Sequence, residues 1–401
     1  MNSSSPAATD WRRTVLLPSV FLLVAMLNLT LVVAGLKELI VDELGGTARD
    51  ASLFFSIEML AYVLFAPLWG VLSDRLGRRV PLAAVGFLLT APLYASYGLL
   101  DSVPAFLAVR FVQGATAVLG WSTLMAMVLD QPDQKRRGRY MGIMGGALTL
   151  GVSIGAPLGG HITRSMGPRA PLEVAAGLFL LLGVGTLIFL RDSGQVRRQI
   201  QIGQILGTLR LQPRLLLPYG FYFVDRLTVG FFVVLFPLYL GSLGVEDPAV
   251  RGRYLALFLF PFSLLQPLAG RLTEKTGPLK PLLAGSFLYG TALCFVGTTG
   301  LYSLWFVMVL LGLLAAVMFP PLITLTAQLS EESTRGSAMG GFNLAGSLGF
   351  AVGPLLGAWA LETRGYGFAF LISGTTEILA VVATLVLLRW FLRTPEKYRI
   401  T

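Results

Sequence analysis

Four ionisable residues lie inside long apolar segments of the chain, where a charge is costly and needs a partner. They are Glu58, Arg110 and the adjacent pair Asp225 and Arg226. A buried carboxylate can take up and release a proton, and a guanidinium can bind an anionic group or neutralise a carboxylate. These residue types therefore indicate proton transfer or charge recognition in an apolar interior.

The composition identifies the apolar segments as membrane spans. Hydrophobic residues make up 55% of the 401 residues, charged residues only 13%, and the mean hydropathy is +0.73. Soluble domains carry about 25% charged residues. Apolar runs of about 20 residues, long enough to cross the hydrocarbon core, recur from end to end. We expect twelve spans, at 14–36, 51–72, 80–100, 104–129, 139–161, 170–190, 215–240, 251–270, 279–299, 302–328, 336–360 and 367–388.

The basic residues are distributed unevenly between the two sides of these spans. One side, which includes both termini, holds 22 of the 31 lysines and arginines, and the opposite side holds 7. The side with more lysine and arginine faces the cytoplasm in most membrane proteins. Both termini are therefore expected in the cytoplasm, and the net charge of +10 indicates orientation rather than binding to nucleic acid.

Few residues suited to metal binding or covalent catalysis are present. Cys294 is the single cysteine and His161 the single histidine, which excludes metal sites built from clusters of either residue. We find no Ser/His/Asp set and no glycine-rich phosphate loop followed by Lys-Ser/Thr. The sequence therefore predicts neither an enzyme nor a bound cofactor or metal.

The two halves of the chain resemble one another. The polar turn at 70–79 has a degenerate counterpart at 270–280, and the glycine-rich segment from Arg136 matches the segment from Ser333 at an offset of about 198 residues. We expect a first bundle at 1–190, a cytoplasmic linker with a short amphipathic helix at 191–214, and a second bundle at 215–401.

Three motifs resemble those of the major facilitator superfamily, in particular its bacterial drug/proton antiporters. The family loop between spans two and three reads roughly G-x-L-[SA]-D-R-x-G-R-[RK], and this chain fills every position. The motif positions of this loop include Gly70, Asp74, Arg75, Gly77, Arg78 and Arg79. Span four contains RFVQG, from Arg110 to Gly114, which is typical of the family. The glycine motif of proton-coupled antiporters is present in span five in an imperfect form, with Gly151, Gly155, Pro157 and Gly159.

The resemblance implies an all-α membrane protein of two six-helix bundles that works by alternating access. It places the loop motif at a cytoplasmic latch, with Asp74 near the start of span eleven at Arg335 and Gly336. It implies a central cavity lined by spans one, four, seven and ten. Small residues at four-residue spacing, as in span five, also let two helix backbones approach closely.

The depths of the buried charges predict one ion pair. Glu58 lies about 21 Å from the cytoplasmic end of span two, and Arg110 lies about 9 Å from the outer end of span four, at a rise of about 1.5 Å per residue. In a core of about 30 Å the two residues are level, so we expect them to pair. Glu58 is then either a proton carrier or half of a static ion pair.

The remaining candidates lie in spans one, seven and twelve. Neighbouring residues on a helix point about 100° apart, so we expect that Asp225 and Arg226 do not pair and that only one faces the cavity. Asp225 is a candidate proton or cation site, and Arg226 a candidate site for an anionic group. Asn28 is either a cavity residue or a packing contact between helices, and Glu377 is expected to have a structural role.

The preferred hypothesis is proton-coupled export of lipophilic or amphipathic small molecules across the inner membrane of the cell. Two alternatives remain within transport: uptake or facilitated movement of an anionic metabolite, and flipping of a lipid-linked molecule. A membrane sensor that binds ligand without transporting it is a third alternative. The expected partners are the small-molecule substrate, protons and the lipid bilayer, and the family resemblance implies a monomer.

Overall fold

The computed structural model describes residues 12–130, 137–192 and 202–393, and within these ranges the chain is helical with no strand. Short helical turns η1 (Arg12–Leu16), η2 (Val33–Gly35) and η3 (Lys37–Glu43) flank the first helix. The helices of the first half are α1 (Leu17–Leu31), α2 (Ala48–Leu76), α3 (Val80–Ser96), α4 (Val103–Leu129), α5 (Arg137–Met166) and α6 (Ala170–Phe189). Those that follow are α7 (Ile202–Leu211), α8 (Leu216–Ser242), α9 (Pro248–Thr276), α10 (Leu279–Val296), α11 (Leu301–Leu329) and α12 (Arg335–Arg393).

The described residues form twelve membrane-spanning segments, as expected. Eleven helices are long and apolar enough to cross a bilayer, and the last of them is broken at Arg364 and Gly365. Gly365 has a φ of 79°, a left-handed conformation that glycine adopts without a steric penalty. The break divides α12 into spans eleven and twelve, close to the boundary expected from hydropathy.

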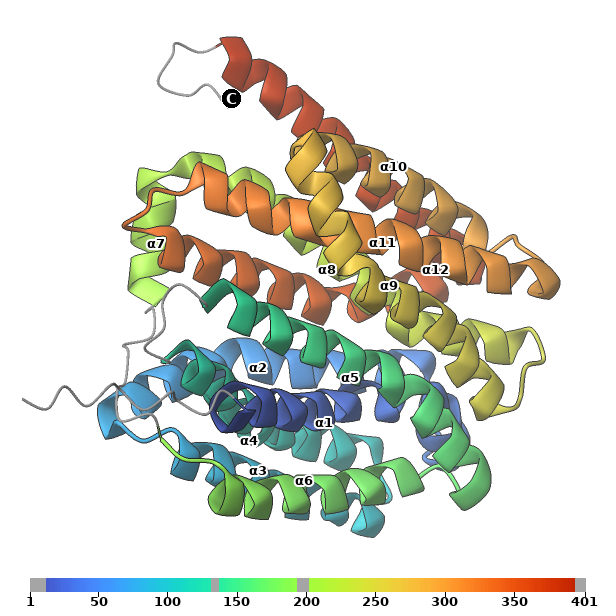
Figure 1. Ribbon diagram of the computed structural model, residues 1–401. Coiled ribbons are helices and arrows are strands. Elements are labelled where there is room, and N and C mark those ends of the chain that lie inside the picture. Colours follow the sequence, from blue (N-terminus) through green and yellow to red (C-terminus); the bar gives the residue numbers. More distant parts are fainter. Residues whose placement is uncertain (1–11, 131–136, 193–201, 394–401) are drawn as a thin grey trace, which may run out of the picture.

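Two bundles lie one above the other in Figure 1, with α1 to α6 in one and α8 to α12 in the other. The bundles meet mainly along two helix pairs, α5 with α9 and α2 with α12. The linker helix α7 packs on the second bundle, where Gln212 donates a hydrogen bond of 2.9 Å to Thr334. The described residues thus form two bundles of six spans each, as the resemblance implies.

The glycine repeats explain how the innermost helices of each bundle pack. A side chain at these positions would overlap a backbone carbonyl of the neighbouring helix, so only glycine permits the approach. In the first bundle Gly151 and Gly155 of α5 lie against Leu23 and Leu27 of α1. The equivalent contacts in the second bundle are Gly349 with Phe223 and Gly353 with Leu227. Corresponding glycines thus make corresponding contacts, as expected for a duplicated scaffold.

Candidate functional site

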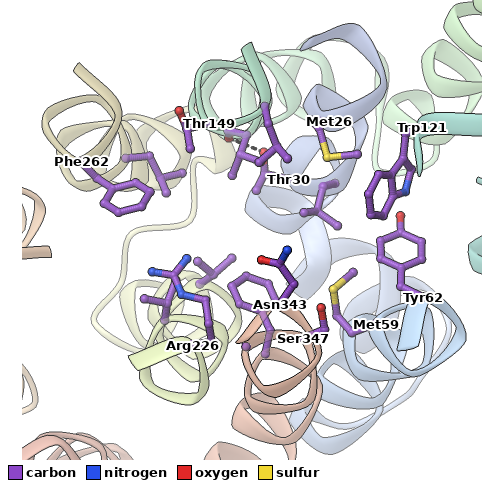
Figure 2. A pocket seen from close by; sticks show the side chains of 18 of the residues that line it. Met26, Thr30, Met59, Tyr62, Trp121, Thr149, Arg226, Phe262, Asn343 and Ser347 are labelled. Atoms are coloured by element: carbon purple, nitrogen blue, oxygen red, sulfur yellow. Dashed lines mark hydrogen bonds between the residues drawn. The ribbon is translucent and has the colours of Figure 1, made fainter. Parts of the chain in front are cut away.

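A cavity of about 340 Å³ lies between the two bundles. Figure 2 shows residues of both bundles around it, with Arg226 on one side and Tyr62 and Trp121 on the other. Its lining comprises Met26, Leu29, Thr30, Met59, Tyr62, Trp121, Met125, Leu148, Thr149, Val152, Tyr222, Arg226, Val229, Val233, Phe258, Leu259, Phe262, Asn343, Gly346, Ser347 and Phe350. Most of these side chains are apolar or aromatic, which suits a ligand with substantial apolar surface.

The helices around the cavity differ in part from the expected set. Spans one, four and seven (α1, α4 and α8) contribute lining residues, as the resemblance implies. Helices α2, α5, α9 and the first half of α12 contribute too, because the bundles meet along them. Span ten (α11) contributes no lining residue among those described, although its Phe319 lies 5.6 Å from the Arg226 guanidinium.

Arg226 is the only charged residue among the described lining residues. Its guanidinium lies 5.3 Å from the ring centroid of Tyr222 and 5.6 Å from that of Phe262. Aromatic faces attract a cation within about 6 Å, so the rings hold the charge beside the cavity. The side chain is 14% exposed and remains accessible to a ligand.

Asp225 and Arg226 pair with each other, and the expectation that they would not is wrong. Nε and Nη2 of Arg226 each lie 2.8 Å from Oδ2 of Asp225. The angle of about 100° between neighbouring helix positions applies to the Cβ atoms. The arginine side chain is long enough to bend back and reach the carboxylate of the preceding residue. The expectation that one residue faces the cavity is confirmed, since Arg226 lines it and Asp225 is 1% exposed behind it.

Glu58 and Arg110 form the expected ion pair in the first bundle. Nη2 of Arg110 lies 2.6 Å from Oε2 of Glu58, and both side chains are 1% exposed. The RFVQG motif explains the approach of α4 to α2, because a Cβ at Gly114 would lie 2.9 Å from that of Ala61. The side-chain amide of Gln113 in the same motif donates a hydrogen bond of 3.1 Å to Oε1 of Glu58.

Further hydrogen bonds and one cation–π contact surround this pair. The Tyr62 hydroxyl donates a hydrogen bond of 2.9 Å to Oε1 of Glu58. Nη1 of Arg110 donates to the Gln113 side chain at 2.8 Å, and its guanidinium lies 4.3 Å from the Phe54 ring. The centre is thus balanced in charge, and both carboxylate oxygens of Glu58 accept hydrogen bonds. Because Tyr62 lines the cavity, its hydroxyl connects Glu58 to the cavity wall.

Asn28 is buried in α1 but is not among the cavity-lining residues. Its side-chain amide nitrogen donates a hydrogen bond of 2.9 Å to the backbone carbonyl of Val24 in the preceding turn. Its amide oxygen is buried and has no hydrogen-bond partner. In this conformation Asn28 is therefore not placed to contact a ligand in the cavity.

Polar contacts of the loop motif connect α2, α3 and α4 with Asp192, which follows α6. Arg79 is buried, with Nη2 2.9 Å from Asp74 and Nε 2.8 Å from Asp130 at the end of α4. The backbone amides of Arg79 and Val80 donate to Asp192 at 2.7 and 2.9 Å.

The turn itself is formed by Gly77, which ends α2 with a φ of 66°. Arg75 and Arg78 are exposed on the surface of this turn, and Gly70 is buried in α2. Arg335 is exposed as well, and the described ion pairs include none between it and Asp74. The expected latch between the bundles is therefore not formed in this conformation.

Ion pairs join the bundles at the opposite end of the cavity. Glu38 of η3 pairs with the buried Arg251 of α9. Arg164 of α5 pairs with Asp247, just before α9, at 3.1 Å. The cavity is therefore closed at the end away from the loop motif.

Several cavity residues were not among the candidates from the sequence, among them Tyr62 and Trp121. Tyr62 follows Glu58 by four residues, so the two share a helix face, and this spacing is a usable signal. Trp121 packs edge-on against Tyr62, with ring centroids 5.5 Å apart, and no sequence pattern indicates that contact. The described residues contain no cluster of three or more His, Cys, Asp or Glu side chains that could hold a metal.

The chain is similar to known transporters over most of its length. It is 25% identical to the multidrug resistance protein MdtG of Enterobacter lignolyticus, covering 96% of this chain and 94% of that protein. It is 26% identical to the human synaptic vesicular amine transporter, covering 86% of this chain and 67% of that protein.

A solved structure confirms the fold, and a family model identifies the family. A bacterial homologue of the human lysosomal transporter Spinster, solved inward-facing and occupied, superposes with a TM-score of 0.82 at 14% identity, covering 99% of each chain. The model of the Major Facilitator Superfamily matches residues 19–252 and 222–400. The chain therefore belongs to the major facilitator superfamily, a family of membrane transporters and not of enzymes.

Proposed function

We propose that this protein is a secondary active transporter that exports lipophilic or amphipathic small molecules in exchange for protons. The observation that carries the proposal is the apolar cavity between the bundles, whose single described charge, Arg226, is backed by the buried Asp225. Its volume of about 340 Å³ suits a small drug-like molecule. The similarity to MdtG and to the amine transporter supports a transport function.

Proton coupling is assigned to the carboxylates of Glu58 and Asp225. Each lies directly behind a cavity residue, Glu58 behind Tyr62 and Asp225 behind Arg226. A substrate in the cavity can therefore change the proton affinity of either carboxylate by displacing its partner or by its own charge. Loss of net charge from the interior lowers the cost of moving between the two access states.

The proposed orientation places the loop motif and both termini in the cytoplasm, in the inner membrane of the cell. The closed end of the cavity, with Glu38 and Arg251, then faces outward, and the structure corresponds to an inward-facing state. In the outward-facing state we propose that Asp74 engages the start of α12 and holds the cytoplasmic ends together. The transporter is proposed to act as a monomer.

The test is substrate-induced proton movement in proteoliposomes that contain a pH-sensitive dye. Lipophilic cations, organic anions and lysolipids are added in turn, with the Glu58→Gln and Asp225→Asn variants as matched samples. Release of protons on addition of one class, lost in either variant, supports coupled export. Proton movement that is absent in the wild type, or unchanged in both variants, contradicts the proposed coupling.

A second candidate is transport of an anionic amphipathic molecule, and one observation favours it. Arg226 is the sole charged side chain among the described lining residues, and the carboxylates nearest the cavity are buried behind that lining. A guanidinium at such a place binds a carboxylate or phosphate through paired hydrogen bonds. Arg226→Gln separates the two candidates, because only the second requires the guanidinium for substrate affinity.

A further inference from the structure

A further buried carboxylate, Glu377, lies in the second bundle and has no role in the function proposed so far. It is in the second part of α12 and is 0% exposed. Its Oε1 accepts a 2.6 Å hydrogen bond from Ser286 of α10, and its Oε2 lies 3.1 Å from the hydroxyl of Thr228 of α8. Among the described ion pairs none includes Glu377, so its hydrogen-bonding neighbours are neutral hydroxyls.

The hydroxyl of Thr228 shows that these hydrogen bonds cannot all be made to an ionised carboxylate. Its oxygen lies 2.9 Å from the backbone carbonyl of Asp225 and 3.1 Å from Oε2 of Glu377. A hydroxyl has one proton to donate, and a carbonyl can only accept. When Thr228 donates to the carbonyl, the contact with Glu377 becomes a hydrogen bond only if Glu377 carries the proton and donates it.

The charges around Glu377 lead to the same result. The titratable and charged groups that face it are Asp225 and Arg226 on α8 and Tyr289 on α10. Tyr289 is neutral at ordinary pH, so two carboxyl groups share one guanidinium. One bound proton makes the cluster neutral, and without it the apolar interior holds an uncompensated negative charge.

We propose that Glu377 is a proton-binding site that holds a proton in this conformation and exchanges it with Asp225. The proton leaves by way of Asp225 to the cavity beside Arg226, and it returns along the same route. A cationic ligand in the cavity favours its release, and an anionic ligand favours its retention. This inference rests on the proposed proton coupling and adds the residue at which the proton resides.

The experiment is infrared spectroscopy of the purified full-length protein in lipid nanodiscs as the pH is varied, without substrate. A protonated buried carboxylic acid gives a carbonyl absorption that an ionised carboxylate lacks. The expected result is that this absorption is present in the wild type at neutral pH and is lost in Glu377→Gln. Its absence in the wild type, or its persistence in the variant, overturns the proposal.

Ser286→Ala keeps the test decisive if Glu377→Gln does not fold. Loss of the hydrogen bond to Oε1 should shift the carbonyl absorption, and an unshifted absorption overturns the assignment to Glu377. In proteoliposomes, Glu377→Gln should lose accumulation driven by a pH gradient and retain exchange of labelled for unlabelled substrate. Unchanged gradient-driven accumulation overturns the proposal.

The two kinds of measurement also separate this inference from the proposed function. The infrared result requires no substrate, so it can fail while Glu58 and Asp225 still couple transport to protons. Conversely, substrate-driven proton movement can be absent in the wild type while the absorption of Glu377 is present. That pair of results contradicts the proposed export and supports the proton site.

Discussion

The two bundles repeat the same backbone packing but surround different charges. In the first bundle one carboxylate, Glu58, faces one guanidinium, Arg110, and both are 1% exposed. In the second bundle Asp225 pairs with Arg226, which is 14% exposed and lines the cavity, and the buried Glu377 has no ion pair among those described. The two bundles thus share a scaffold but carry their charges on different spans, two and four in the first bundle and seven and twelve in the second.

The difference predicts different behaviour of the two centres. The centre of the first bundle is neutral without a bound proton and makes hydrogen bonds to both carboxylate oxygens. The second centre becomes neutral only with a bound proton, and its one cation can reach the cavity. We therefore expect the loss of a charge to cost more stability at the first centre and to change ligand affinity more at the second.

The largest expected effect is loss of stability in Arg110→Met. The substitution leaves Glu58 buried without a cation, and breaking a buried ion pair in this way costs about 3–5 kcal/mol. Arg226→Met should cost less, because Arg226 is partly exposed and a second proton can neutralise the remaining carboxyl groups. Unfolding in detergent, followed by circular dichroism, measures both. Equal losses would show that the two centres are not different in kind.

The double variant Glu58→Gln/Arg110→Met is the control for this prediction. Replacing both members of a buried ion pair by neutral side chains is often close to neutral in free energy. We therefore expect the double variant to recover most of the stability that Arg110→Met loses. Failure to recover it would mean that the side chain of Arg110 contributes by packing, for instance on Phe54.

The next largest effect tests what the two bundles have in common. Gly155→Ala and Gly353→Ala each place a Cβ against a backbone carbonyl, of Leu27 and of Leu227 respectively. Overpacking of this kind costs about 1–3 kcal/mol, and the loss should be similar in both bundles. Gly145→Ala, where an added Cβ meets open space, is the matched control and should not lose stability. A loss in only one bundle would contradict the duplicated packing.

The fold was predictable from the sequence because its determinants are local. A span requires only length and apolar composition, and the glycine repeats mark the close helix pairs through Gly155 and Gly353. The Glu58–Arg110 pair was predictable for a similar reason, since the rise along two straight helices gives the depth of each residue.

The cavity was less predictable because lipid is as apolar as the protein interior. Hydrophobic periodicity therefore does not tell which helix face meets a neighbour and which meets lipid. Trp121 could not be placed in the cavity on this basis. The error at Asp225 and Arg226 has another cause, because helix angles ignore the reach of a long side chain.

A smaller effect tests ligand charge at the second centre. Arg226→Gln should weaken binding of an amphipathic carboxylate about 10-fold, which corresponds to about 1.4 kcal/mol for a lost charged hydrogen bond. Binding of a neutral molecule of the same size should change much less. Isothermal titration calorimetry with the two matched ligands measures the difference, and an equal change for both would remove Arg226 from charge recognition.

The smallest effect compares one hydroxyl at each centre. Ser286 donates a hydrogen bond of 2.6 Å to Glu377, and Tyr62 donates one of 2.9 Å to Glu58. Loss of a neutral donor is worth about 1 kcal/mol, or a little under one pH unit. Because Ser286 favours the ionised form of Glu377, Ser286→Ala should move the midpoint of gradient-driven transport to higher pH. Tyr62→Phe should leave the midpoint in place, because Arg110 still neutralises Glu58. A shift in Tyr62→Phe alone would mean that the proton that sets this midpoint is bound at Glu58 rather than at Glu377.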